Sequence, residues 1–105
     1  MVEEIREIEV VVREADVRDF MNWDGSLEGD VLAAEVARYC AAYARVIQRA
    51  YPDAMVAVTA GDTSGYDEVF VNGVHVARAD FGTDAEFGMD AEYVALLGGQ
   101  VIDEL

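Results

Sequence analysis

Hydrophobic and polar residues alternate between Ile5 and Glu14. One face of this segment takes Ile8, Val10 and Val12, and the other takes Glu7, Glu9, Val11 and Arg13. The spacing of Ile5, Ile8 and Val12 also approximates that of a helix, but the β-branched run at 10–12 favours a strand. The following segment, Ala15 to Asp24, is interpreted as a connection with one possible helical turn.

A long amphipathic helix is predicted from about Asp30 to Ala50, because apolar residues recur there at helical spacing. They are Leu32, Val36, Tyr39, Tyr43, Val46, Ile47 and Ala50. Pro52 ends the helix near Tyr51. On the opposite face Arg38, Arg45 and Arg49 form an arginine stripe. The stripe either lies in solvent among nearby acidic residues or pairs with a second copy of the chain, which would make a homodimer.

A strand at 54–59 and a glycine-containing loop at 61–65 precede the strongest turn signal of the chain, Asn72-Gly73. A two-residue turn there predicts a hairpin with a defined register. It pairs Val71 with Val74, Phe70 with His75, Val69 with Val76 and Asp67 with Arg78. The valines then share a core face, whereas Phe70 and His75 share the other face.

The C-terminal third contains a tandem hexapeptide, 81–86 and 87–92, each copy of the form Phe-Gly-x-Asp-Ala-Glu. Each Asp-Ala-Glu is interpreted as a helix start with Asp as the cap. A helix is predicted from about Ala91 to Leu97, where Gly98-Gly99 stops it. The element order is therefore β-α-β-β-β-α. It predicts a single α+β domain over residues 1–105, with a small, mostly antiparallel sheet on which one long helix and a short C-terminal helix pack.

Charge is the most unusual feature of the composition. The chain has 22 Asp and Glu against seven Arg and no Lys, which gives a formal net charge of −15. Because 53% of the residues are hydrophobic, this is not a disordered polyanion. The charge argues against direct binding to nucleic acid or to an anionic membrane. No secretory signal or membrane-spanning stretch is present, so we expect a cytoplasmic protein.

Catalytic chemistry has little support in the sequence. A single cysteine, Cys40, a single histidine, His75, and two serines supply no convincing nucleophile–base pair and no zinc-ligand cluster. The loop at 61–65 lacks the lysine of a phosphate-binding loop, and the acidic stretch at 80–92 lacks the spacing of an EF-hand. We therefore expect a protein that is not an enzyme, with no catalytic residue, metal or cofactor.

The acidity itself points to a function. Alternate residues of a strand are ~6.8 Å apart, a separation comparable with that of nucleic-acid phosphates, so rows of carboxylates can occupy a basic groove. In size and charge the chain is similar to phage-encoded DNA mimics, anti-CRISPR proteins and the immunity proteins that neutralise nuclease toxins. This resemblance implies an inhibitor whose partner is a basic protein or nucleoprotein complex. One alternative is an immunity protein that neutralises a nuclease toxin. The alternative of another class is a small metabolic or structural domain whose acidity reflects only its environment.

Acidic residues concentrated after position 60 are predicted to form one continuous partner-binding surface. They are Asp62, Asp67, Glu68, Asp80, Asp84, Glu86, Asp90 and Glu92. Affinity also requires apolar anchors. The sequence offers Trp23 in the first connection, Tyr66 beside the glycine-containing loop, and Phe70 on the outer face of the hairpin.

Overall fold

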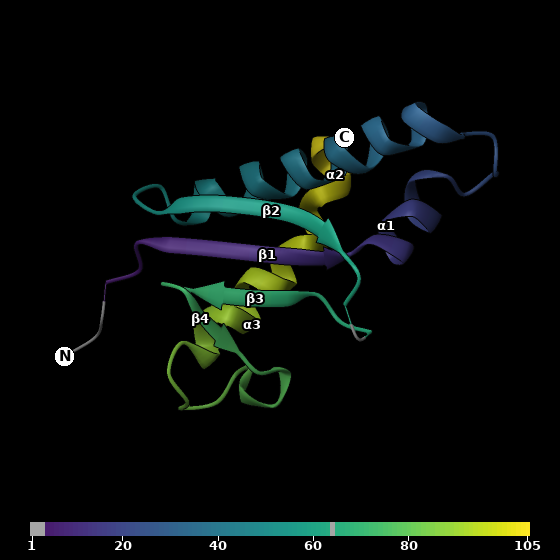
Figure 1. Ribbon diagram of the computed structural model, residues 1–105. Coiled ribbons are helices and arrows are strands. Elements are labelled where there is room, and N and C mark those ends of the chain that lie inside the picture. Colours follow the sequence, from purple (N-terminus) through teal and green to yellow (C-terminus); the bar gives the residue numbers. More distant parts are fainter. Residues whose placement is uncertain (1–3, 64) are drawn as a thin grey trace.

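A four-stranded sheet is covered on one side by helices in the computed structural model, which describes residues 4–63 and 65–105 (Figure 1). The strands are β1 (Glu7–Arg13), β2 (Met55–Gly61), β3 (Glu68–Val71) and β4 (Val74–Val76). The helices are α1 (Glu14–Met21), α2 (Gly29–Ala50) and α3 (Gly88–Leu97), with 3-10 helices η1 (Arg78–Asp80) and η2 (Gly98–Glu104). The predicted α+β class with one long helix and a C-terminal helix is confirmed.

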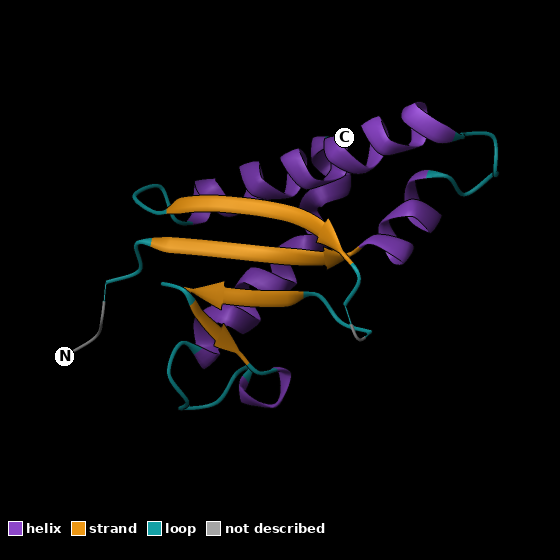
Figure 2. Cartoon of the chain, viewed as in Figure 1, coloured by secondary structure: helices purple, strands orange, loops and turns teal. Residues whose placement is uncertain are grey.

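The sheet order is β2-β1-β3-β4. β1 runs parallel to β2 and antiparallel to β3, and β3 is antiparallel to β4, so two of the three pairings are antiparallel. Figure 2 shows α2 and α3 behind the sheet and no helix in front of it. The alternation of β1 explains this arrangement, because Ile8, Val10 and Val12 are buried whereas Glu7 and Glu9 are exposed.

The hairpin has the predicted register, with Val71 opposite Val74, Phe70 opposite His75 and Val69 opposite Val76. Asn72 (φ 50°) and Gly73 (φ 79°) both have positive φ, as this tight turn requires. The Asn72 side chain also accepts hydrogen bonds from the backbone N–H of Arg6 (2.7 Å) and Glu7 (3.0 Å), which ties the turn to the start of β1.

The predicted pairing of Asp67 with Arg78 is wrong, because β4 already ends at Val76 and the chain turns into η1. The Arg78 guanidinium lies instead over the rings of Tyr66 and Phe81, 4.8 and 5.5 Å from their centroids. Arg78 therefore stacks on aromatic rings in place of facing Asp67 across the hairpin.

The connection after β1 contains an eight-residue helix, α1, and is thus more regular than predicted. A helix this short is marginal by itself, so its stability comes from tertiary packing. Val17 is buried in the core, and Phe20 makes an edge-to-face contact with Tyr39 of α2 (5.8 Å between ring centroids). Glu14 and Asp16 in its first turn complement the helix dipole.

The two hexapeptide copies adopt different structures, which contradicts the prediction that each begins a helix. The first copy forms turns, and α3 begins at Gly88, three residues before the predicted start. Phe87, with φ 60°, is the N-cap residue of α3 in place of Asp90, and no side chain caps the helix. The backbone N–H of Gly82 donates to the carbonyl of Gly88 (2.9 Å), so equivalent glycines of the two copies contact each other.

Tyr43 joins the helices of the covering layer. Its side chain is fully buried, and its hydroxyl donates to the backbone carbonyl of Val94 at 2.8 Å. The α-helix α3 ends at Leu97, before Gly98-Gly99, as predicted, and the chain continues as η2, which packs along α2 with Val101 buried. An added Cβ at Gly98 would lie 3.3 Å from the Tyr43 hydroxyl, so a small residue suits this crossing.

Candidate partner-binding surface

The arginine stripe of α2 is occupied within the chain. Glu104 of η2 accepts a two-pronged contact from Arg49 (Nη2–Oε2 3.0 Å) and lies 3.6 Å from Arg45. Arg38 binds Glu35 and the backbone oxygen of Leu105. The hydrogen bond from Arg49 is the main reason that the pKa of the Glu104 carboxyl lies below its ordinary value. The arginine stripe therefore binds the C-terminal segment of the same chain. It no longer supports a homodimer, because these arginines already have acidic partners.

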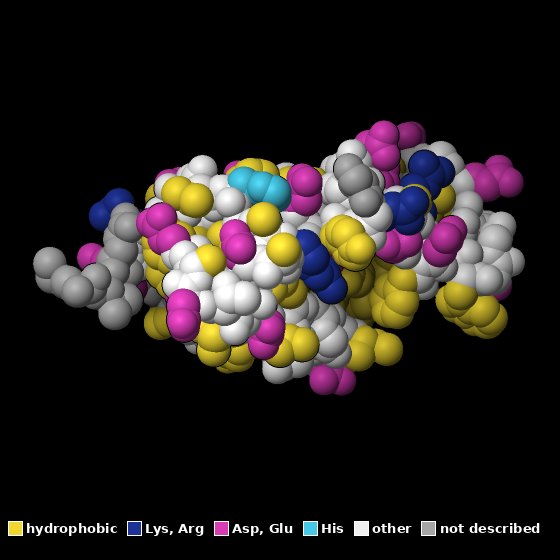
Figure 3. Space-filling model, turned by 90° about the horizontal axis from the view of Figure 1, so that it is seen from below, with side chains coloured by type: hydrophobic (Ala, Val, Ile, Leu, Met, Phe, Trp, Pro, Cys, Tyr) yellow, Lys and Arg dark blue, Asp and Glu magenta, His cyan; other side chains and the backbone are white. Residues whose placement is uncertain are grey.

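The acidic residues predicted to bind a partner stay outside these arginine pairs. Within the described residues, arginine side chains pair with Asp16, Glu35 and Glu104. Of the eight predicted acidic residues, Glu68 is the only one with a basic side chain of a described residue beside it, the imidazole of His75 at 3.9 Å. Figure 3 shows acidic side chains scattered over one face of the molecule with apolar side chains between them.

The structure gathers one part of the predicted set around the outer side of the hairpin. Tyr66, Asp67 and Glu68 line a hollow of about 120 Å³ together with His75 and Arg78. Phe70 adjoins it, because its ring lies 5.0 Å from the imidazole of His75. This hairpin cluster therefore combines two carboxylates with aromatic and cationic groups.

Two of the predicted acidic residues have roles inside the fold. Asp67 accepts a hydrogen bond from the backbone N–H of Arg13 at 3.0 Å, and it is only partly exposed. Asp90 accepts one from the hydroxyl of Tyr51 at 3.0 Å. Burial, and then this bond, raise the pKa of Tyr51 above its ordinary value. Both carboxylates are thus less available to a partner than the sequence suggested.

The remaining acidic residues lie on separate segments. Asp84 and Glu86 are exposed in the turn before α3. Glu92 is exposed on α3, and its carboxylate lies beside the backbone of Gly82. Asp80 is partly exposed in η1. Asp62 lies at the end of β2, in a different hollow from the hairpin cluster. The eight carboxylates do not share a single pocket.

Trp23 is the most exposed large apolar side chain, at 86%. It lies in the loop between α1 and α2, at the opposite end of the molecule from the β3–β4 turn (Figure 1). The loop is ordered by hydrogen bonds in both directions between Asn22 and Leu27 and by a turn in which Asp24 accepts from Ser26. Trp23 is therefore well presented, but it is remote from the β3–β4 turn, which Phe70 adjoins.

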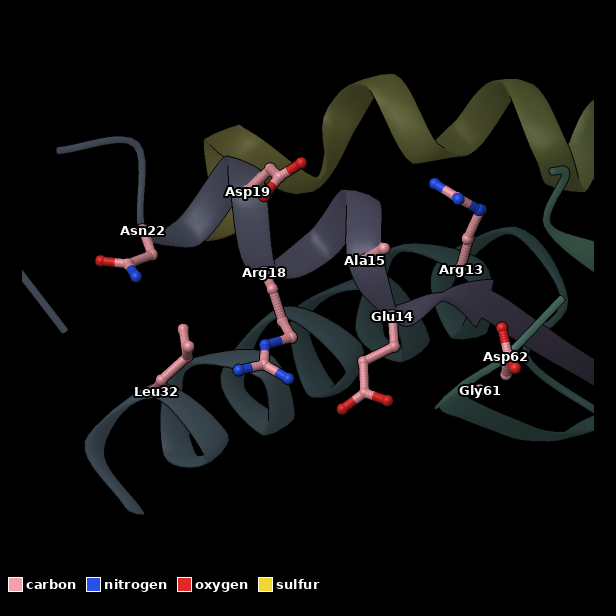
Figure 4. Close-up of a pocket in the computed structure, with 9 residues that line it drawn as sticks. All are labelled: Arg13, Glu14, Ala15, Arg18, Asp19, Asn22, Leu32, Gly61 and Asp62. Carbon is pink, nitrogen blue, oxygen red and sulfur yellow. The ribbon is translucent and has the colours of Figure 1, made fainter. Parts of the chain in front are cut away.

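A hollow of about 610 Å³ was not predicted, because residues of α1 line it. It lies beside the carboxyl ends of the parallel strands β1 and β2, where open sheets commonly bind ligands. Figure 4 shows Arg18 and Glu14 reaching from α1 toward α2. Among the described residues, its lining carries both signs of charge and no cysteine or histidine: Arg13, Glu14, Ala15, Arg18, Asp19, Asn22, Leu32, Gly61 and Asp62.

The two reactive side chains lie on opposite sides of the sheet. Cys40 is buried on α2, and burial raises the pKa of its thiol, so the reactive thiolate is disfavoured. His75 is exposed on the open side of β4, beside Phe70. The two groups cannot act as a nucleophile and its base. Among the described residues, no group of three or more potential ligands is arranged to hold a metal ion.

The structure adds two glutamates that were not predicted to belong to the candidate surface, and both lie on the strand β1. Glu7 and Glu9 project from the uncovered side of β1, with Glu9 directly opposite Phe70. Their alternation was visible in the sequence, but the central place of β1 in the sheet was not.

No described helix is long and apolar enough to span a membrane. Comparison of the chain with protein-family models, curated proteins and solved structures gives no match.

Proposed function

We propose that this chain is a cytoplasmic, non-enzymatic inhibitor that occupies the basic groove of a nucleic-acid-handling protein or complex, in the manner of anti-CRISPR proteins and other phage DNA mimics. The observation that supports it most is the excess of carboxylates over arginines, −15 in formal charge. The arginine pairs of the described residues leave exposed carboxylates such as Asp84, Glu86 and Glu92 unneutralised.

Electrostatics explains why such a surface suits a basic groove. Complementary charge accelerates encounter and selects the partner, whereas apolar contacts supply much of the affinity. Both kinds of group are present around the hairpin, where Glu68 adjoins Tyr66 and Phe70. A purely solubilising surface would not require exposed aromatic residues beside its carboxylates.

The test is binding to a panel of purified nucleases, guide-RNA-dependent nucleases and DNA-binding proteins, measured by anisotropy of the labelled chain. The triple variant Asp84→Lys, Glu86→Lys and Glu92→Lys should lose most of the binding. A matched triple variant, Asp19→Lys, Asp30→Lys and Asp53→Lys, has the same net charge at exposed positions elsewhere and should retain it. Absence of binding to every basic protein of the panel would overturn the proposal, and equal losses in both variants would reduce it to an effect of total charge.

A further inference from the structure

The side of the sheet that no helix covers forms a surface of its own, which we call the open face. Its residues alternate with the buried ones along each strand. They are Glu7, Glu9 and Val11 of β1, Met55, Ala57 and Thr59 of β2, Glu68 and Phe70 of β3, and His75 of β4. The open face is acidic along β1, with Met55 and Ala57 on one flank and Phe70 on the other.

Register places the glutamates between apolar neighbours. Glu7 lies beside Met55, whose side chain is 75% exposed, and Glu9 lies between Ala57 and Phe70. These five residues border a shallow hollow of about 220 Å³ that ends at Gly73.

From this geometry we infer that the open face binds an arginine side chain presented by an extended basic segment of the partner. The inference rests on the proposed function only for the basic character of that partner. A guanidinium is planar, so it can lie against the Phe70 ring while its N–H groups reach the carboxylates of Glu7 and Glu9. The methylene stem of the arginine would pack against Met55 and Ala57.

The negative charge of the open face also decides which molecule can bind there. A second copy of the chain placed on this face would bring Glu7 and Glu9 against the same glutamates of its partner, and like charges in contact are strongly unfavourable. Neither carboxylate forms an ion pair with another described residue, so both are available to a cation. A lysine would satisfy the charge, but it would not stack on Phe70 or donate from a planar fork.

The probe is an eight-residue peptide with arginine at every second position, because an extended chain presents alternate residues on one side. Titration followed by amide chemical shifts should perturb residues of β1, β2 and β3 that form the open face. The variant Glu7→Gln/Glu9→Gln should bind the peptide about five- to tenfold more weakly, since each lost contact is a charge-assisted hydrogen bond. The control Asp19→Asn/Asp30→Asn removes the same charge from exposed positions outside the open face and outside the predicted acidic surface, and it should bind within about twofold.

Aromatic stacking is tested separately. The lysine version of the peptide should bind several-fold more weakly than the arginine version, and Phe70→Leu should remove that difference. Circular dichroism of each variant establishes that it folds, and Met55→Ala, at an exposed side chain, serves as a second apolar variant without a packing cost. Equal affinity for the two peptides, equal losses in the two charge variants, or shifts confined to the turn at 82–87 would each overturn the inference.

The inference and the proposed function fail in different ways. If the unaltered chain displaces DNA from a basic protein and Glu7→Gln/Glu9→Gln displaces it equally well, the open face is not the site although the function stands. If that variant loses the arginine peptide selectively and the unaltered chain displaces no DNA, the site stands and the function does not.

Discussion

The hydroxyl of Tyr43 has a measurable part in the stability of the fold. It is fully buried and donates to the carbonyl of Val94 at 2.8 Å. Val94 is itself fully buried, on α3. Tyr43→Phe keeps the ring and its packing but removes the buried hydrogen bond to the Val94 carbonyl.

The expected loss is about 1 kcal/mol in the free energy of unfolding, which is the typical net contribution of one intramolecular hydrogen bond. In a domain of this size each kcal/mol lowers Tm by roughly 4–8 °C. Urea unfolding followed by circular dichroism measures the change, and the m-value should stay constant because the packing is unchanged. Tyr93→Phe is the matched control at a half-exposed ring and should change stability by less than about 0.5 kcal/mol. A Tyr43→Phe variant as stable as that control would refute the link between α2 and α3.

Three further predictions follow from the packing and the titrating groups. Gly88→Ala should cost about 3 kcal/mol by thermal unfolding, because the new Cβ would overlap the Asp80 carbonyl oxygen and lie 2.8 Å from that of Thr83; Gly99→Ala, with no atom within 4 Å, should be nearly neutral. Burial raises the pKa of Tyr43 above its unfolded value, so stability is fully present below about pH 10 and should fall at higher pH by about 1.4 kcal/mol per pH unit, a slope that Tyr43→Phe should reduce. Arg49 lowers the pKa of Glu104, so the stability that this ion pair contributes is present above the ordinary carboxyl pKa and is lost as the pH falls through the lowered pKa. Amide exchange in η2 should accelerate in that acidic range. Glu104→Gln should show the faster exchange already at neutral pH.

Local chemistry determined the parts of the fold that the sequence predicted correctly. Asn72-Gly73 permits few turn types, so the pairing of Phe70 with His75 followed directly. The apolar period of α2 was equally informative, because seven buried residues lie on one face of that helix. Neither feature depends on the rest of the molecule for its identification.

Tertiary contacts determined the parts that the sequence did not predict. The helix α1 depends on Val17 packing into the core, and the two hexapeptides have nearly the same sequence but different structures. Asp67 and Asp90 were selected for the site by their charge alone. Their hydrogen bonds to Arg13 and Tyr51 become apparent only when distant segments are brought together.

Mutual exclusion with nucleic acid tests the central claim most directly. The affinity of the chain for a basic partner identified in the panel is measured at increasing concentrations of the duplex or guide that the partner binds. If both ligands occupy one groove, the apparent Kd of the chain should rise in proportion to the nucleic-acid concentration once the groove is filled, with no ternary complex. A Kd that stays constant, with a complex containing all three components, would show that the carboxylates bind elsewhere and would contradict nucleic-acid mimicry.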